Sequence, residues 1–239
     1  MAHKLYISKF CPFAHRAYLV AQAKGLFASG DIELVEVSLP TPDWYNEKVN
    51  PRETVPALQL PERDGKPGAV VPESLIVAQY IDERFAGKGP SFFPADAKQR
   101  ADVRLFMSEC GNAIPGLYKS LFAAKQPAEF EALYKSAKDD LSYLEGLYRD
   151  AAADRDAGND GPFFLGQNVS MADVAFAPFL HRFKITLGHF AKVPDFLGHT
   201  PRLAAMLAAV EALPAFQQTT PSPEFFIQGY ASKIKEPEA

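Results

Sequence analysis

The first third of the chain alternates short apolar runs with a helical pattern. Residues 4–8 form an apolar run that is typical of a strand. Residues 13–24 follow as a helical stretch. Pro12 suits its first turn because the proline nitrogen carries no hydrogen, and Gly25 suits its end. Residues 32–39, rich in Val, Ile and Leu, predict a second strand. A strand, a helix and a strand in so short a span predict a βαβ unit with parallel strands.

The next segment predicts a hairpin and a helix. A proline-dotted crossover without a clear helical pattern occupies residues 40–56. Short apolar runs at 57–60 and 69–71 then flank the turn-forming residues 63–68, which favours a hairpin. A helix is predicted over residues 73–85. The resulting order, β-α-β, crossover, β-β-α, is that of a thioredoxin-like domain.

After this domain the pattern becomes helical. Residues 86–96 contain two glycines and two prolines, a composition typical of a linker. Apolar residues then recur at steps of three and four with almost no strand signal, and residues 128–153 predict one long helix. Pro115 predicts a kink or a break in the helical stretch before it.

A further helix start is indicated around Ser170. Ser170 suits the capping position, Asp173 suits the reciprocal position three residues later, and Val169 and Val174 suit the two staple positions. The residues that follow are almost all apolar, so we expect this helix in the core of the second domain. A last helix is predicted over residues 201–213, before a proline-punctuated tail.

Together these patterns predict an α/β thioredoxin-like N-terminal domain followed by an all-α helical-bundle C-terminal domain. The boundaries expected are residues 1–85 for the first domain, 86–96 for the linker and 97–239 for the second. The length of 239 residues also favours two domains. The chain is 47% hydrophobic and 23% charged, which is ordinary globular composition and excludes a disordered or collagen-like chain.

The net charge and the cysteine content limit the kinds of binding partner and cellular compartment that we expect for this protein. The net charge of −4 argues against a large nucleic-acid interface. We expect no membrane span, because no run of ~18 uncharged apolar residues occurs, and the N-terminus lacks the apolar core of a signal peptide. Two cysteines, Cys11 and Cys110, favour the reducing cytoplasm over an oxidising compartment. The five histidines are scattered without metal-ligand spacing, so no metal is expected.

The main candidate for chemistry is Cys11, which lies between a strand end and a helix N-terminus. The helix dipole there favours an anion, so the thiol is expected to ionise below the ~8.5 of an ordinary cysteine. A thiolate attacks disulfides and electrophiles. Ala14 occupies the position where a dithiol oxidoreductase has its second cysteine, so this site is monothiol. The alternative is a buried structural cysteine, which is our interpretation of Cys110.

Two other short motifs fit a peptide-like ligand. A cis Val55-Pro56 bond would leave the Val55 backbone open to pair with an extended peptide, although an ordinary edge proline fits equally well. Glu73 and Ser74 open a helix, where N–H groups and a hydroxyl suit a carboxylate and the Glu73 carboxylate suits an ammonium. A simple helix cap explains Ser74 equally well. With Cys11, these motifs predict a small peptide that bears a carboxylate, an amine and a thiol.

The same motifs resemble the glutathione transferase family, and most of all its cysteine-containing omega and lambda classes. The resemblance extends from about residue 4 to about residue 215. It rests on Phe10-Cys11-Pro12-Phe13-Ala14-His15-Arg16, on Asn50-Pro51 with Val55-Pro56-Ala57-Leu58, on Glu73-Ser74-Leu75-Ile76, and on the stretch from Gly166 to Asp173.

The resemblance implies specific roles in binding glutathione as a co-substrate. Cys11 would form the mixed disulfide with glutathione, and Phe13 would pack beside it. Val55, before Pro56, would pair with the cysteinyl unit. The γ-glutamyl end would be held by Glu73 and Ser74.

The remaining parts of the site follow the family less closely. Omega members often place a lysine in the crossover, but residues 39–43 lack one here, and Lys48 lies further along. The acceptor pocket would lie between Cys11 and the helical domain, and members of the family form homodimers. Aromatic candidates for the pocket wall are Phe106, Tyr118, Phe122, Phe176 and Phe183.

Three functions remain open from the sequence. The leading hypothesis is a glutathione-dependent thiol transferase that reduces mixed disulfides, dehydroascorbate or glutathionyl conjugates through Cys11. The second is a transferase that conjugates glutathione to electrophiles, with Ser8 or Tyr6 activating the glutathione thiol. The third is a non-catalytic binding protein of the same fold.

Overall fold

The computed structural model describes residues 2–153, 155 and 158–234, and the chain divides into two compact units. Residues up to Ser91 form the first unit together with Leu213–Thr220, and Phe92–Ala212 form the second with the segment from Pro221 onward. Among the described residues, no helix is both long enough and apolar enough to cross a membrane.

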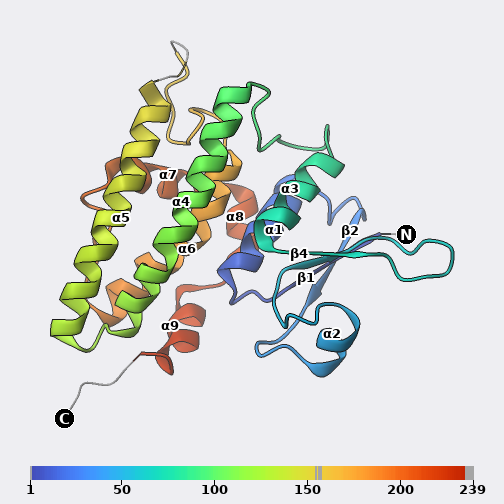
Figure 1. The fold of residues 1–239 in the computed structure, drawn as a ribbon, viewed down its shortest axis with the longest axis horizontal. Coiled ribbons are helices and arrows are strands. Elements are labelled where there is room, and N and C mark those ends of the chain that lie inside the picture. The colour runs from blue at the N-terminus through green and yellow to red at the C-terminus, as the bar shows by residue number, and fades with distance from the viewer. Residues whose placement is uncertain (1, 154, 156–157, 235–239) are drawn as a thin grey trace. The chain divides into compact units, whose positions relative to one another are not determined.

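The first unit contains a four-stranded sheet in the order β2-β1-β3-β4 (Figure 1). Strand β1 is parallel to β2 and antiparallel to β3, and β4 is antiparallel to β3. Helices α1 and α3 pack against each other on one face, and α2 lies on the other (Figure 1). The elements are β1 (His3–Ile7), α1 (Pro12–Ala23), β2 (Ile32–Glu36), α2 (Asp43–Lys48), β3 (Ala57–Gln59), β4 (Val70–Pro72) and α3 (Ser74–Arg84).

The core of this unit explains the pattern of apolar residues in the sequence. Leu5 of β1 lies opposite Leu34 of β2 and Leu58 of β3, so apolar side chains continue across the sheet. Leu5, Leu58 and Val20 of α1 have no exposed surface. Burial of each such side chain contributes ~1.5–3 kcal/mol. The thioredoxin-like prediction is therefore confirmed in its strand order and in its main helices.

Two features of the first unit differ from the prediction. The crossover contains the short helix α2, which escaped detection because a six-residue helix that buries one side chain, Tyr45, produces no helical periodicity. The segment 213–220, which the predicted boundaries assign to the helical domain, instead joins this unit through α8 (Pro214–Thr219). Thr219 Oγ1 lies 2.9 Å from His15 Nε2, and the Phe216 ring packs on the His15 ring.

The second unit is helical throughout its described regular elements. It comprises α4 (Ala97–Phe122), α5 (Pro127–Ala153), α6 (Met171–Phe190), α7 (Pro201–Glu211) and α9 (Pro223–Ala231). Helix α4 packs against both α5 and α6, and α6 is buried along most of its length. The expected core position of α6 is confirmed, whereas the helices of the proline-rich tail were not predicted.

Pro115 does not break the helix that contains it, contrary to the break considered above. Helix α4 is continuous from Ala97 to Phe122. A proline removes one helical N–H donor and leaves the carbonyl four residues earlier, here that of Gly111, without its helical partner. Because both Gly111 and Pro115 are exposed, water can bind that carbonyl.

The start of α6 is held by the buried carboxylate of Asp173. This carboxylate accepts hydrogen bonds from the Ser170 backbone N–H (2.7 Å), the Ser170 hydroxyl (2.8 Å) and the Phe164 backbone N–H (2.9 Å). The Tyr148 hydroxyl of α5 also donates to it. The reach of Asp173 back to Ser170 is the capping contact expected from the sequence. It connects α6 to α5 and to the loop before α6.

Replacing Asp173 by alanine should lower the free energy of unfolding by about 3 kcal/mol, because four donors lose this buried acceptor. The Asp150→Ala variant is the control, since Asp150 is exposed on α5, and it should change stability by less than about 0.5 kcal/mol. Urea unfolding of the full chain measures both. Equal effects of the two substitutions would contradict the structural role of Asp173.

Candidate active site

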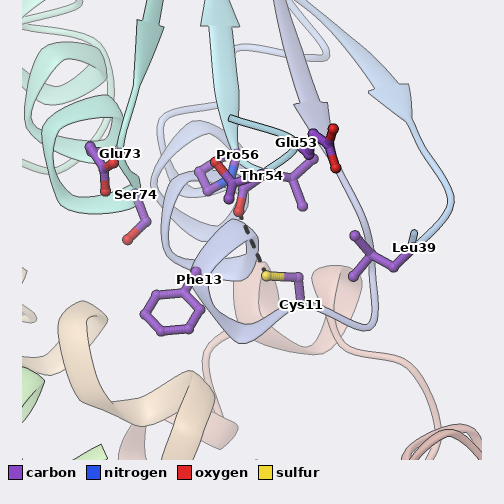
Figure 2. A pocket seen from close by; sticks show the side chains of 9 residues that line it. Cys11, Phe13, Leu39, Glu53, Thr54, Pro56, Glu73 and Ser74 are labelled. Atoms are coloured by element: carbon purple, nitrogen blue, oxygen red, sulfur yellow. Dashed lines mark hydrogen bonds between the residues drawn. The ribbon is translucent and has the colours of Figure 1, made fainter. Parts of the chain in front are cut away.

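A cavity of about 320 Å³ opens in the first unit where four of its segments meet. The start of α1 supplies one wall, the segment after β2 supplies Leu39, the loop before β3 supplies another wall, and the start of α3 supplies a further one (Figure 2). The lining residues are Cys11, Phe13, Leu39, Glu53, Thr54, Val55, Pro56, Glu73 and Ser74. All six residues predicted to act in catalysis or to bind glutathione therefore lie around one cavity.

Cys11 is the residue immediately before α1. Its backbone N–H bonds to the Ser8 carbonyl (3.0 Å), its own carbonyl accepts from the His15 N–H (3.1 Å), and Pro12 begins the helix. The N–H groups in the first turn of a helix point toward its N-terminus, which is where Cys11 lies. The side chain is partly exposed and lines the cavity. Cys11 is therefore accessible to a reaction partner, whereas Cys110 is fully buried.

Two interactions act in opposite directions on the Cys11 sulfur. The N-terminus of α1 favours the thiolate through its dipole and its N–H groups. The thiol form, by contrast, donates to the Val55 carbonyl, with Sγ 3.7 Å from the oxygen (Figure 2). This bond is long even for sulfur, and a ligand donor that binds the same carbonyl would compete with it. Ligand binding at Val55 then favours the thiolate.

The Val55 backbone is positioned by the residue before it. The Thr54 carbonyl accepts hydrogen bonds from the Tyr45 hydroxyl of α2 (2.7 Å) and from Asn50 Nδ2 (2.8 Å). Burial raises the pKa of Tyr45 to about 12, so its hydroxyl keeps the donor proton throughout the physiological range. The Val55-Pro56 peptide bond is cis, which is one of the two alternatives left open by the sequence. Helix α2 and Asn50 thus fix the loop that faces Cys11.

The start of α3 forms the opposite wall of the cavity. Glu73 has a positive φ of 71°, an uncommon conformation for a residue other than glycine, and Ser74 is the first helical residue. Arg16 of α1 is buried and donates to the Ser74 hydroxyl oxygen (3.1 Å). Arg52 Nη1 lies 3.0 Å from a carboxylate oxygen of Glu73. The arrangement suits a ligand carboxylate at Ser74 and a ligand ammonium at Glu73.

Several residues of this site were missed by the sequence interpretation. The sequence analysis assigns Arg16 no role in the site, yet its guanidinium lies 5.3 Å from the Phe13 ring and bonds to Ser74. The signal available was its position three residues after Phe13, which places both side chains on one face of α1. Leu39, Glu53 and Thr54 belong to irregular segments, and no periodicity marks them.

The two residues offered as alternatives to Cys11 lie outside the cavity lining. Tyr6 is buried, donates to Gln59 Oε1 (2.9 Å), and its ring packs against Tyr45. Burial raises the pKa of Tyr6, which disfavours the phenolate that would activate a bound thiol. Ser8 is also buried and does not line this cavity.

The five aromatic residues expected in an acceptor wall all lie in the second unit. Phe106, Phe176 and Phe183 are buried, with Phe106 packed against Tyr148 and Phe164. Tyr118 and Phe122 are partly exposed, and their rings contact each other. The acceptor role of these residues stays a prediction. Within the described residues, no group of three or more His, Cys, Asp or Glu side chains is placed to hold a metal ion.

Comparison with protein families identifies both parts of the chain. Residues 5–89 match the family model described as "Glutathione S-transferase, N-terminal domain", and residues 101–219 match "Glutathione S-transferase, C-terminal domain". The chain belongs to the glutathione S-transferase family. The fold class expected from the sequence is thereby confirmed as well.

Individual relatives place the chain near two classes of the family. Glutathione S-transferase L1 of Arabidopsis thaliana is 33% identical over 94% of this chain and 84% of its own length. Glutathione S-transferase omega-1 of Rattus norvegicus is 28% identical over 88% of this chain and 77% of its own length. The expected similarity to the lambda and omega classes is confirmed.

A solved structure gives the same answer for the fold. Leishmania TDR1, described as a unique trimeric glutathione transferase, superposes with a TM-score of 0.80 at 31% identity. The match covers 98% of this chain and 49% of the Leishmania chain, so our chain spans about half the length of that protein.

Replacing Arg16 by methionine should weaken glutathione binding about tenfold, because Ser74 loses a charge-assisted hydrogen bond and the buried positive charge behind it. The turnover number should change much less, since Cys11 keeps its position at α1. Titration calorimetry with glutathione and a comparison of KM with kcat measure the effect, and Arg16→Lys should restore part of the affinity. An unchanged affinity in a folded Arg16→Met variant would show that Arg16 has only a packing role.

Replacing Asn50 by alanine should raise the KM for glutathione about fivefold, because the Thr54 carbonyl loses one of its two donors and Val55 becomes less well fixed. Loss of the hydrogen bond should also lower the free energy of unfolding by about 1 kcal/mol. Steady-state kinetics and urea unfolding check both effects. Asn112→Ala, an exposed change on α4, is the control and should leave both values close to those of the unmodified protein.

Proposed function

We propose that this protein is a glutathione-dependent thiol transferase in which Cys11 is the nucleophile. The observation that carries the proposal is the position of Cys11. It lies at the N-terminus of α1, is partly exposed, and lines the same cavity as the N-terminus of α3. A cysteine in this position is able to form the thiolate and to reach a disulfide.

The reaction consists of two thiol–disulfide exchanges. In the first, the Cys11 thiolate attacks the glutathionyl sulfur of a mixed disulfide, a Cys11–glutathione disulfide forms, and the substrate leaves as its thiolate. In the second, the thiolate of another glutathione attacks this disulfide, releases glutathione disulfide and restores the Cys11 thiolate. In sum, the mixed disulfide and one glutathione thiolate give the substrate thiolate and glutathione disulfide, so glutathione is the reductant and Cys11 is regenerated. No second cysteine of the chain takes part, consistent with Ala14 at the resolving position.

The cavity offers a partner for each polar part of the γ-glutamyl and cysteinyl units. Ser74, backed by Arg16, suits the α-carboxylate of the γ-glutamyl unit, and Glu73 suits its ammonium group. The Val55 backbone suits the amide of the cysteinyl unit, which brings its sulfur toward Cys11. This order matches the charges of the ligand, because only the γ-glutamyl end of glutathione carries an ammonium beside a carboxylate.

The relatives support glutathione as the co-substrate. The lambda- and omega-type proteins reported above carry the name glutathione S-transferase, and the match extends over most of this chain. We extend the proposal to the reduction of mixed disulfides, dehydroascorbate or glutathionyl conjugates as acceptor reactions. A homodimer and a cytoplasmic location complete it.

Replacing Cys11 by serine should abolish glutathione-dependent reduction of hydroxyethyl disulfide, with a loss of at least about a thousandfold, because a hydroxyl does not form a mixed disulfide. Treatment with glutathione disulfide should add one glutathionyl group to the unmodified protein and none to Cys11→Ser, as read by intact-mass spectrometry. Absorbance titration should show the thiolate forming below the ~8.5 of an ordinary cysteine.

Cys110→Ala is the matched control, since this cysteine is buried and should affect neither the activity nor the adduct. Retained reduction in the Cys11→Ser variant would contradict the proposal. A second result would also contradict it: the unmodified protein shows no reductase activity, and the Cys11→Ser variant conjugates glutathione to an aryl halide as fast as the unmodified protein does. That outcome favours the conjugating alternative.

A further inference from the structure

The charges that line the cavity are distributed unevenly. Among its nine lining residues, all of them described by the structure, the charged ones are Glu53 and Glu73, and both are acidic. Glu73 is matched by the Arg52 guanidinium at 3.0 Å. Glu53 lies on the side of Leu39, away from Glu73 and Ser74, with Cys11 below and between the two sides (Figure 2).

The backbone holds Glu53 in place. Its N–H donates to the Asn50 carbonyl (3.0 Å), and its own carbonyl accepts from the Thr41 hydroxyl at 3.4 Å. Its φ is 58°, in the left-handed region that residues other than glycine rarely adopt. The side chain is exposed while its Cα is fixed one residue before Thr54, whose carbonyl is held by Tyr45 and Asn50. The carboxylate therefore stays near the rim of the cavity.

The orientation of a bound γ-glutamyl peptide follows from its charges. Its ammonium and α-carboxylate belong together at Glu73 and Ser74, and its thiol belongs at Cys11. The C-terminal residue of the peptide then extends toward Leu39 and Glu53. In glutathione this residue is glycine, with an ionised carboxylate at neutral pH. The Glu53 carboxylate consequently lies on the side of the cavity that would receive a group of the same charge.

We propose that Glu53 determines specificity at this end of the site, favouring γ-glutamyl thiol peptides whose C-terminal carboxylate is masked or replaced by a cation. An ester or neutral amide removes the repulsion, and an amide that carries an amine replaces it by attraction. This inference rests on the proposed function, because it assumes that Cys11 reacts with such a peptide. It names a substrate class that the family resemblance does not supply.

The size of the effect follows from the exposure of Glu53. Exposed charge pairs typically change binding by a factor of about 2 to 5, and salt screens them over ~10 Å at moderate ionic strength. We expect each change of the peptide, from carboxylate to ester and from ester to amine-bearing amide, to lower KM about threefold at low salt. The differences should shrink as salt is added, which a steric effect would not do.

Three thiols test this with hydroxyethyl disulfide as the common acceptor. They are glutathione, its glycyl monoethyl ester, and glutathione amidated at the glycyl carboxyl with a diamine. For the unmodified protein, KM should fall in that order. Glu53→Gln should bring the KM of the amine-bearing amide to that of the ester, and Glu53→Lys should reverse the order. The control is Glu62→Gln, an exposed carboxylate of the same unit outside this cavity, which should keep the unmodified order.

The comparison across variants distinguishes an effect of charge from an effect of ligand size. Each thiol has the same size in every assay, so a change of the KM ratios between variants reports the charge at position 53. Equal KM ratios in the unmodified protein, Glu53→Gln and Glu53→Lys would overturn the inference. So would a preference of the unmodified protein for glutathione over its ester at low salt. Both of those results leave the thiol transferase proposal standing, whereas failure of all three thiols to support reduction refutes that proposal instead.

Discussion

The site depends on two helix N-termini that face one cavity. Helix α1 begins beneath the Cys11 sulfur and favours its anion, while α3 begins at Ser74 and favours a carboxylate. The sheet fixes the two helix starts relative to each other, because α1 follows β1 and α3 follows β4 in the same four-stranded sheet. The proposed nucleophile and the proposed anchor for a charged ligand thus come from the same sheet and its helices.

The buried polar contacts of the first unit supply the rest of the geometry. Backbone donors and acceptors in a loop are satisfied either by water or by side chains, and only the second choice fixes their direction. The side chains of Tyr45 and Asn50 donate to the Thr54 carbonyl and fix its direction. Arg16 likewise fixes the Ser74 hydroxyl by donating to it. The positive φ of Glu73 costs ~1–3 kcal/mol, and it is tolerated where α3 and Arg52 hold the residue on both sides.

The charges near the cavity differ between its two sides. At α3 the charges alternate, with Arg16 behind Ser74 and Arg52 beside Glu73, and this side is where we propose that the γ-glutamyl end binds. At the rim near Leu39, the carboxylate of Glu53 contributes a negative charge. In the proposed function, one end of the peptide is recognised by hydrogen bonds of fixed geometry. In our further proposal, the other end is selected by an exposed charge that salt screens.

The sequence by itself determined the order of the elements, the thioredoxin-like and helical architecture, and the residues of chemical interest. Apolar periodicity specifies a strand or a helix locally, and Cys11, Val55-Pro56 and Glu73-Ser74 stand at element ends that this periodicity locates. Tertiary structure alone decided that α2 forms around the buried Tyr45 and that residues 213–220 pack against His15. It also decided that Arg16 supports Ser74, 58 positions away. These contacts join residues distant along the chain, and their energy exists only after folding brings both partners out of water.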